Sequence, residues 1–100
     1  MTTNQIVAHT ILEQLGGNRF AAMTGAKNFA CDESSLQFSI GRNSHGINKV
    51  RVTLEASDTY TVEFFKIRKL DAKLVERCND IYADQLQDVF SYITGLDTHL

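Results

Sequence analysis

The feature that most constrains this sequence is an alternation of apolar and polar residues in its central part. Apolar residues occupy every second position of 36–40 and again of 50–54. Residues 60–68 form a third segment, rich in β-branched and aromatic side chains. A period of two sends successive side chains to opposite faces of a strand. Because 41–46 and 55–58 read as turns, the pattern predicts an antiparallel sheet with one buried face.

Helical periodicity flanks this predicted sheet on both sides. Apolar residues recur at intervals of three and four over 6–15, and the glycine pair at 16–17 predicts the end of that helix. A second apolar stripe occupies 82–93 and is followed by Gly95, a typical residue after a helix C-terminus. The sequence therefore predicts a single α+β domain, with the C-terminal helix packed on the sheet.

The connecting segments carry weaker signals. We predict a short strand over 19–24, a turn at 25–28 and a polar loop over 31–35. Residues 71–78 fit either the start of a long helix or another strand, and the Asn-Asp pair at 79–80 favours the strand because it supplies a helix N-cap. The sheet then has four or five strands. The predicted core that joins it to the last helix comprises Val50, Val52, Leu54, Val62, Phe64, Leu86, Val89 and Ile93.

The composition limits the class of protein. The chain has 100 residues, of which 43% are hydrophobic and 22% charged, and its net charge is −2. These values are typical of one globular domain and give no general reason to expect nucleic acid or an anionic membrane as partner. The apolar runs are too short to cross a bilayer, and the N-terminus lacks a signal-peptide pattern. With two cysteines that form no CxxC pair, the chain reads as a cytoplasmic protein with reduced thiols.

The glycine-rich stretch GGNRFAAMTGAKNF, residues 16–29, raises the question of a phosphate-binding loop. A P-loop needs Lys directly after its last Gly, then Ser or Thr, then a helix. Here Lys27 comes two positions after Gly25, and Asn28 follows it. We therefore interpret the stretch as a helix end, a strand and a turn. Lys27 and Asn28 remain candidates for binding because loops often carry binding residues.

Residue types that support catalysis or metal binding form no recognisable pattern. The three histidines and two cysteines lack metal-ligand spacing. The segment 31–35 contains Cys, Asp and Ser residues but has no histidine base near it in the sequence. We predict that the protein is not an enzyme, has no metal or other cofactor, and uses Cys78 as a small core residue.

Basic residues gather on the predicted strands. Aromatic and cationic side chains on a sheet can bind single-stranded nucleic acid, by stacking on bases and by contacting phosphates. A solvated strand edge explains the same lysines, since they discourage pairing with other chains. Lys73 extends the basic group. The residues that would form the nucleic-acid surface are Lys49, Arg51, Phe65, Lys66, Arg68 and Lys69.

The C-terminal part is acidic. Residues 78–100 contain four Asp and neither Lys nor Arg. Asp80, Asp84 and Asp88 recur every four residues, so on one helix their carboxylates would lie about 6 Å apart along the axis. That spacing is close to the phosphate step of a nucleic-acid strand, which predicts a protein-binding face that mimics nucleic acid. An ordinary solvated helix face, with Asp80 as its N-cap, is the alternative.

Three stretches, LGGNRFAAMTGAKNF, DTYTVEFFKIRK and IYADQLQDVFSYITGLDTHL, resemble a family of small proteins of bacteriophages and other bacterial mobile elements. The resemblance covers most of the chain, and it implies a strand at 71–78 and a bacterial cytoplasm as the place of action. We predict a non-enzymatic protein that binds and modulates a host protein or nucleoprotein, for example as an anti-CRISPR-like inhibitor of a defence nuclease. Single-stranded nucleic-acid binding through the sheet is the alternative, and the oligomeric state is open between monomer and homodimer.

Overall fold

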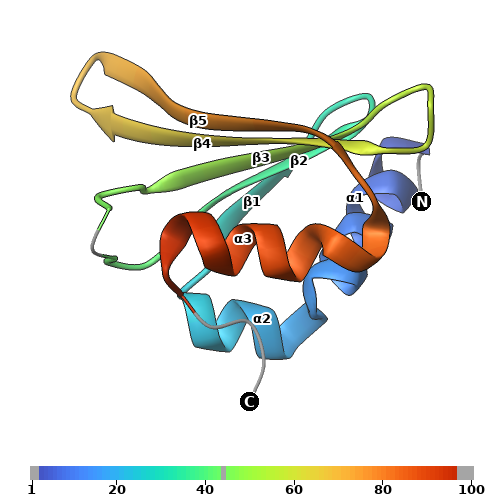
Figure 1. Cartoon of the computed structure of the whole chain (residues 1–100), viewed down its shortest axis with the longest axis horizontal. Coiled ribbons are helices and arrows are strands. Elements are labelled where there is room, and N and C mark those ends of the chain that lie inside the picture. The colour runs from blue at the N-terminus through green and yellow to red at the C-terminus, as the bar shows by residue number, and fades with distance from the viewer. Residues whose placement is uncertain (1–2, 44, 97–100) are drawn as a thin grey trace.

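Three helices pack against one face of a five-stranded antiparallel sheet (Figure 1). The computed structural model describes residues 3–43 and 45–96. Each strand pairs with its sequence neighbour. The predicted α+β fold is confirmed, and no helix in these residues is long and apolar enough to span a membrane. The elements are α1 (Thr3–Leu15), α2 (Gly17–Thr24), β1 (Lys27–Cys31), β2 (Ser35–Ser39), β3 (Lys49–Leu54), β4 (Tyr60–Arg68), β5 (Asp71–Ile81), the 3₁₀ turn η1 (Ala83–Gln85) and α3 (Leu86–Thr94).

The strand predicted over 19–24 is wrong, because these residues belong to helix α2. Helix spacing buries Phe20 and Thr24, which are four positions apart on one face. The Thr24 hydroxyl donates to the Phe20 carbonyl, at 2.8 Å. The short run of small and apolar residues between them has no period of its own, so the sequence alone does not separate helix from strand.

The structure explains why the GGNRFAAMTGAKNF stretch has a glycine at position 25. Gly25 ends α2 in the left-handed conformation, with φ 71°, and its N–H donates to the Ala21 carbonyl. A Cβ on Gly25 would lie 3.2 Å from the Gly41 Cα, and the Gly41 N–H donates to the Thr24 carbonyl at 2.7 Å. The glycine therefore serves a helix end and a close backbone approach. Residues 27–31 form strand β1, so the turn predicted at 25–28 is wrong at 27 and 28, whereas the loop predicted over 31–35 is confirmed at 32–34.

Strand β5 confirms the strand predicted at 71–78 and extends it to Ile81. The prediction that 79–80 cap a helix is wrong, because Asp80 lies inside the strand with φ 57°. The bulge that contains it lets β5 stay paired with β4 as far as the Tyr60–Ile81 pair. The final helical segment starts three residues later, where the Gln85 Oε1 accepts a hydrogen bond from the Tyr82 N–H at 3.0 Å.

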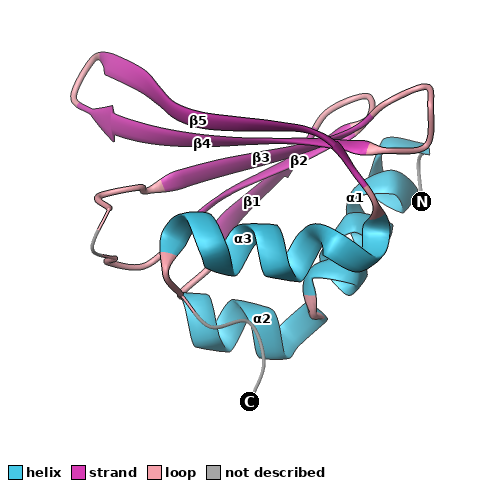
Figure 2. Ribbon diagram, viewed as in Figure 1, coloured by secondary structure: helices cyan, strands magenta, loops and turns pink. Residues whose placement is uncertain are grey.

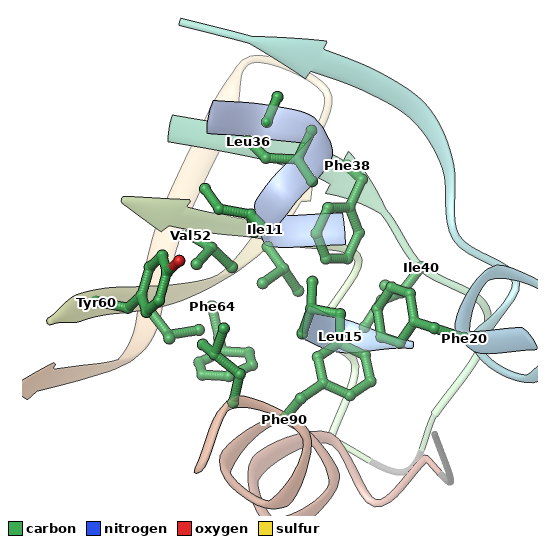
Figure 3. Close-up of a cluster of buried hydrophobic side chains, with 14 of the residues drawn as sticks. Ile11, Leu15, Phe20, Leu36, Phe38, Ile40, Val52, Tyr60, Phe64 and Phe90 are labelled. Carbon is green, nitrogen blue, oxygen red and sulfur yellow. The ribbon is translucent and has the colours of Figure 1, made fainter. Parts of the chain in front are cut away.

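The core lies between the sheet and the helices, and it contains the residues predicted for it (Figure 3). Of those, Leu54, Val89 and Ile93 are partly buried at its margin and the other five are fully buried. Phe20 of α2 and Phe90 of α3 meet edge to face, with ring centroids 5.0 Å apart. Helix α1 also contributes to the core, which extends the prediction. Its buried residues are Ala8, Ile11 and Leu15.

Candidate nucleic-acid interface

One face of the sheet is left uncovered, because all three helices lie on the other side (Figure 2). Val50 and Val52 of β3 lie opposite Phe64 and Val62 of β4, and all four side chains are buried beneath the helices. The residues between them must therefore face away from the helices, since successive side chains in a strand point to opposite faces. We call this uncovered surface the open face.

A row of side chains crosses the open face on all five strands. The strand register aligns Lys27 of β1 with Ser39 of β2, and Ser39 with Lys49 of β3. Lys49 in turn lies opposite Phe65 of β4, and Phe65 lies opposite Leu74 of β5. The row therefore places the Phe65 ring beside Lys49 and brings Lys27, from a distant part of the sequence, into line with them two strands further on.

The adjacent row is built around Glu63, whose side chain is only 8% exposed although it lies on the open face. Arg51 of β3 reaches one carboxylate oxygen, with Nη2 2.8 Å from Oε1. Arg77 of β5 reaches the other, with Nη2 2.8 Å from Oε2. The two guanidinium groups shield the carboxylate and tie β3, β4 and β5 together.

The electrostatics of this triad keep Glu63 ionised. Burial by itself raises the pKa of Glu63, but hydrogen bonds and charge from Arg77 and Arg51 outweigh burial and hold the pKa below its ordinary value. One carboxylate is then shared by two guanidinium cations, so the triad as a whole remains positively charged. The Arg51 guanidinium carbon also lies 5.6 Å from the centroid of the Phe65 ring, within the range of a cation–π contact.

The strands of the open face thus carry four cations and one carboxylate. The turns that follow β1 and β3 add the carboxylates of Asp32, Glu33 and Glu55. Asp32 and Glu33 line a hollow with Arg51, and Glu55 lines another with Arg51 and Arg77. All four cations are exposed or half-exposed, so their side chains can reach a ligand. The cations are Lys27, Lys49, Arg51 and Arg77.

A hollow of about 400 Å³, lined by both polar and apolar residues, lies beside the first row. The Asn48 side chain fixes one wall, since its Nδ2 donates to the Ile67 carbonyl at 2.7 Å and its Oδ1 accepts from the Ile67 N–H at 2.8 Å. Asn28, which bulges from β1 with φ 57°, lines the opposite side together with Gln37. The hollow thus offers amide groups next to the Lys49 side chain.

The structure divides the predicted basic surface into two parts. Arg51 and Phe65 share the open face with Lys49, as the sequence predicted. Lys66 and Arg68 do not, because they alternate with Phe65 and share the helix side with buried Phe64. The Lys66 side chain approaches Gly46 of the β2–β3 loop. Lys69 lies in the exposed β4–β5 turn.

Sequence reasoning named one of the open-face cations without placing it there, and it missed another. Lys27 was predicted to be a binding candidate in a turn, beside Asn28, but both residues begin strand β1. Arg77 lay in the segment 71–78, for which a strand was favoured, but it was not named as a candidate. Cross-strand register supplies the missing signal, because it pairs Arg77 with Glu63.

The predicted acidic stripe is wrong in its geometry. Asp80 lies in β5, Asp84 in η1 and Asp88 in α3, so the three carboxylates do not share one helix. The evenly spaced mimic of a phosphate backbone is therefore not formed. Asp84 and Asp88 are both exposed, and the next position along the row is Tyr92, whose side chain is 86% exposed.

The two cysteines lie apart from the open face, whereas Asp32, Glu33, Ser34 and Ser35 of the 31–35 segment line a hollow with Arg51. Cys31 ends β1 and lines an apolar groove of about 520 Å³ against α1, near His9. The His9 Nε2 lies 3.1 Å from a carboxylate oxygen of Glu13. Cys78 packs against the core as predicted, and burial, then the charge of Glu76, raise the pKa of its thiol. In the residues that the structure describes, no three His, Cys, Asp or Glu side chains are grouped to hold a metal ion.

No protein-family model, curated protein or solved structure matches this chain. Functional inference therefore rests on the surfaces. The open face combines guanidinium and ammonium groups, which bind phosphate oxygens, with a ring and a guanidinium plane on which bases stack.

Proposed function

We propose that this protein binds single-stranded nucleic acid across the open face of its sheet. One observation carries the proposal: Lys49, Arg51 and Arg77 lie on the two strands that flank Phe65, on a face that none of the described helices covers. Lys27 lies two strands beyond Lys49, and these four cations of β1, β3 and β5 outnumber the one carboxylate on the strands of this face. This arrangement supplies both groups that sequence-tolerant binding requires, which are cations for the backbone and flat groups for the bases.

The spacing suits an extended strand. Lys27 and Lys49 are separated by one intervening strand, as are Arg51 and Arg77, so each pair is about 10 Å apart. A nucleic-acid backbone that crosses the sheet can therefore contact cations on both sides of Phe65. The Arg51 guanidinium already lies over that ring, and it offers a second plane for a base.

The test is fluorescence anisotropy with labelled single-stranded DNA at low salt. The open-face variant Lys27→Glu/Lys49→Glu should lose at least about tenfold in affinity and show a smaller salt dependence, because it lacks two phosphate contacts. The matched control is Lys66→Glu/Arg68→Glu, which makes the same change in net charge on the other side of the sheet. It should retain most of the binding. Equal losses in the two variants, or no binding by the parent, would refute the proposal.

A second candidate function is binding to a host protein through the row Asp84, Asp88 and Tyr92. The observation that favours it is the exposure of two tyrosines beside the carboxylates, since Tyr82 is 60% and Tyr92 86% exposed. Tyrosine is enriched at protein interfaces, and its large ring costs little entropy to bury. With the resemblance to mobile-element proteins, this row supports a role as inhibitor of a defence nuclease in a bacterial cytoplasm.

A further inference from the structure

Strand β5 has an outer edge that pairs with no other strand of residues 3–43 and 45–96. Its residues 71–77 are all exposed, and they include two large apolar side chains, Leu74 at 41% and Val75 at 40%. An unpaired edge presents a row of backbone donors and acceptors that another strand can use. The edge thus offers hydrogen-bonding groups and apolar surface together.

A bulge in β5 gives this edge an unusual charge pattern. Phe65 lies opposite Leu74 while Phe64 lies opposite Glu76, so Val75 is the extra residue. Residues three positions apart normally point to opposite faces, but the extra residue brings Lys73 and Glu76 to the same face, the helix side. A cation and a carboxylate therefore flank the bulge on one side of the sheet.

We propose that β5 pairs antiparallel with β5 of a second copy of this chain, about a twofold axis between Leu74 and Val75. In this register Lys73 of each copy lies opposite Glu76 of the other, and both share the helix side. Ala72 lies opposite Arg77, and both share the open face. The pairs that involve Lys73 and Ala72 thus match in face, and the axis generates two ion pairs from one complementary sequence.

The surroundings of Lys73 favour a second copy as the occupant. Lys66 lies directly opposite Lys73 in the β4–β5 hairpin, so two ammonium groups are neighbours. Among the described residues neither lysine has an ion-pair partner, and Glu76 has none either. Glu76 of a second copy would supply the missing carboxylate. Charges usually protect an edge from pairing, but here they are self-complementary.

This dimer goes beyond the proposed function and does not depend on it. The pairing would form a continuous ten-stranded sheet with both open faces on one side. A contact of about four residue pairs per strand belongs with small, transient interfaces, so we expect a dissociation constant on the order of micromolar. The dimer should therefore be seen as a concentration-dependent equilibrium in the absence of nucleic acid.

Sedimentation velocity over a concentration series tests the dimer through charge reversal. The parent should shift from its monomer mass of 11.2 kDa toward twice that value, whereas Lys73→Glu and Glu76→Lys alone should each stay monomeric because like charges then oppose. An equimolar mixture of the two variants should dimerise again, since the heterodimer restores both pairs. Matched controls are Arg42→Glu and Glu33→Lys, which make the same charge changes at exposed sites away from β5 and should dimerise like the parent.

Three results would overturn the proposal. A parent that remains monomeric at all concentrations has no such interface. Single variants that dimerise like the parent place the contact elsewhere, for example on β1 or the open face. A mixture that stays monomeric after both singles have lost the dimer shows that Lys73 and Glu76 do not face each other.

Discussion

Replacing Glu63 with Gln tests whether the Arg51–Glu63–Arg77 triad holds the open face together. Gln keeps the size of the side chain and removes its charge. The carboxylate, 8% exposed, receives hydrogen bonds from both arginines, at 2.8–3.2 Å. A hydrogen bond to a charged group contributes about 1.5–3 kcal/mol, but the arginine side chains are 43% and 52% exposed, so solvent screens part of it. We expect the free energy of unfolding at neutral pH to fall by about 1–3 kcal/mol.

The contribution of Glu63 to the free energy of unfolding should depend on pH. Folding lowers the pKa of Glu63 below its ordinary value of 4.5, so the stabilisation is complete above that value. It is lost as the pH falls through the folded pKa, because the protonated carboxyl no longer attracts the arginines. Glu63→Gln lacks this step. The stability difference between parent and variant should therefore be largest at neutral pH and shrink in acid.

Urea denaturation of both proteins, from neutral pH to well below pH 4.5, measures this difference. Other carboxylates titrate alike in both proteins and cancel in the comparison. Glu33→Gln is the matched control, since Glu33 is exposed and forms no ion pair among the described residues. A variant as stable as the parent at neutral pH would refute the reasoning. So would a difference that stays constant into acid.

Two further predictions concern the C-terminal helix. Leu86→Ala should lower the free energy of unfolding by about 2–5 kcal/mol, because Leu86 is 1% exposed and its truncation leaves a cavity between α3 and the sheet; an unchanged urea midpoint would contradict this. Asp84→Asn/Asp88→Asn should change stability by about 0.5 kcal/mol or less but reduce capture of a basic host protein from lysate, with the loss shrinking at high salt; undiminished capture at low salt would remove the second candidate function.

The strands that sequence predicted well are those with one buried face. In β2, β3 and β4 the core enforces a period of two, which is visible in the residues themselves. Strand β1 is exposed along its whole length, so nothing imposes a period on it. The helix N-cap predicted at the Asn-Asp pair, 79–80, was wrong for another reason. The residues that cap helices also tolerate a left-handed backbone, and Asp80 uses that tolerance inside a strand.

The open face was harder to predict than the fold, because the register between strands decides which residues of different strands share a face. Lys66 follows Phe65 on the same strand, so the period of two already places these two side chains on opposite faces. The position of Lys49 needs the register between strands, which sets it opposite Phe65. A shift of one residue exchanges the two faces of a strand. Arg77 reaches Glu63 only because the β5 bulge stands between residues 74 and 76, so the triad depends on a feature that composition and periodicity do not reveal.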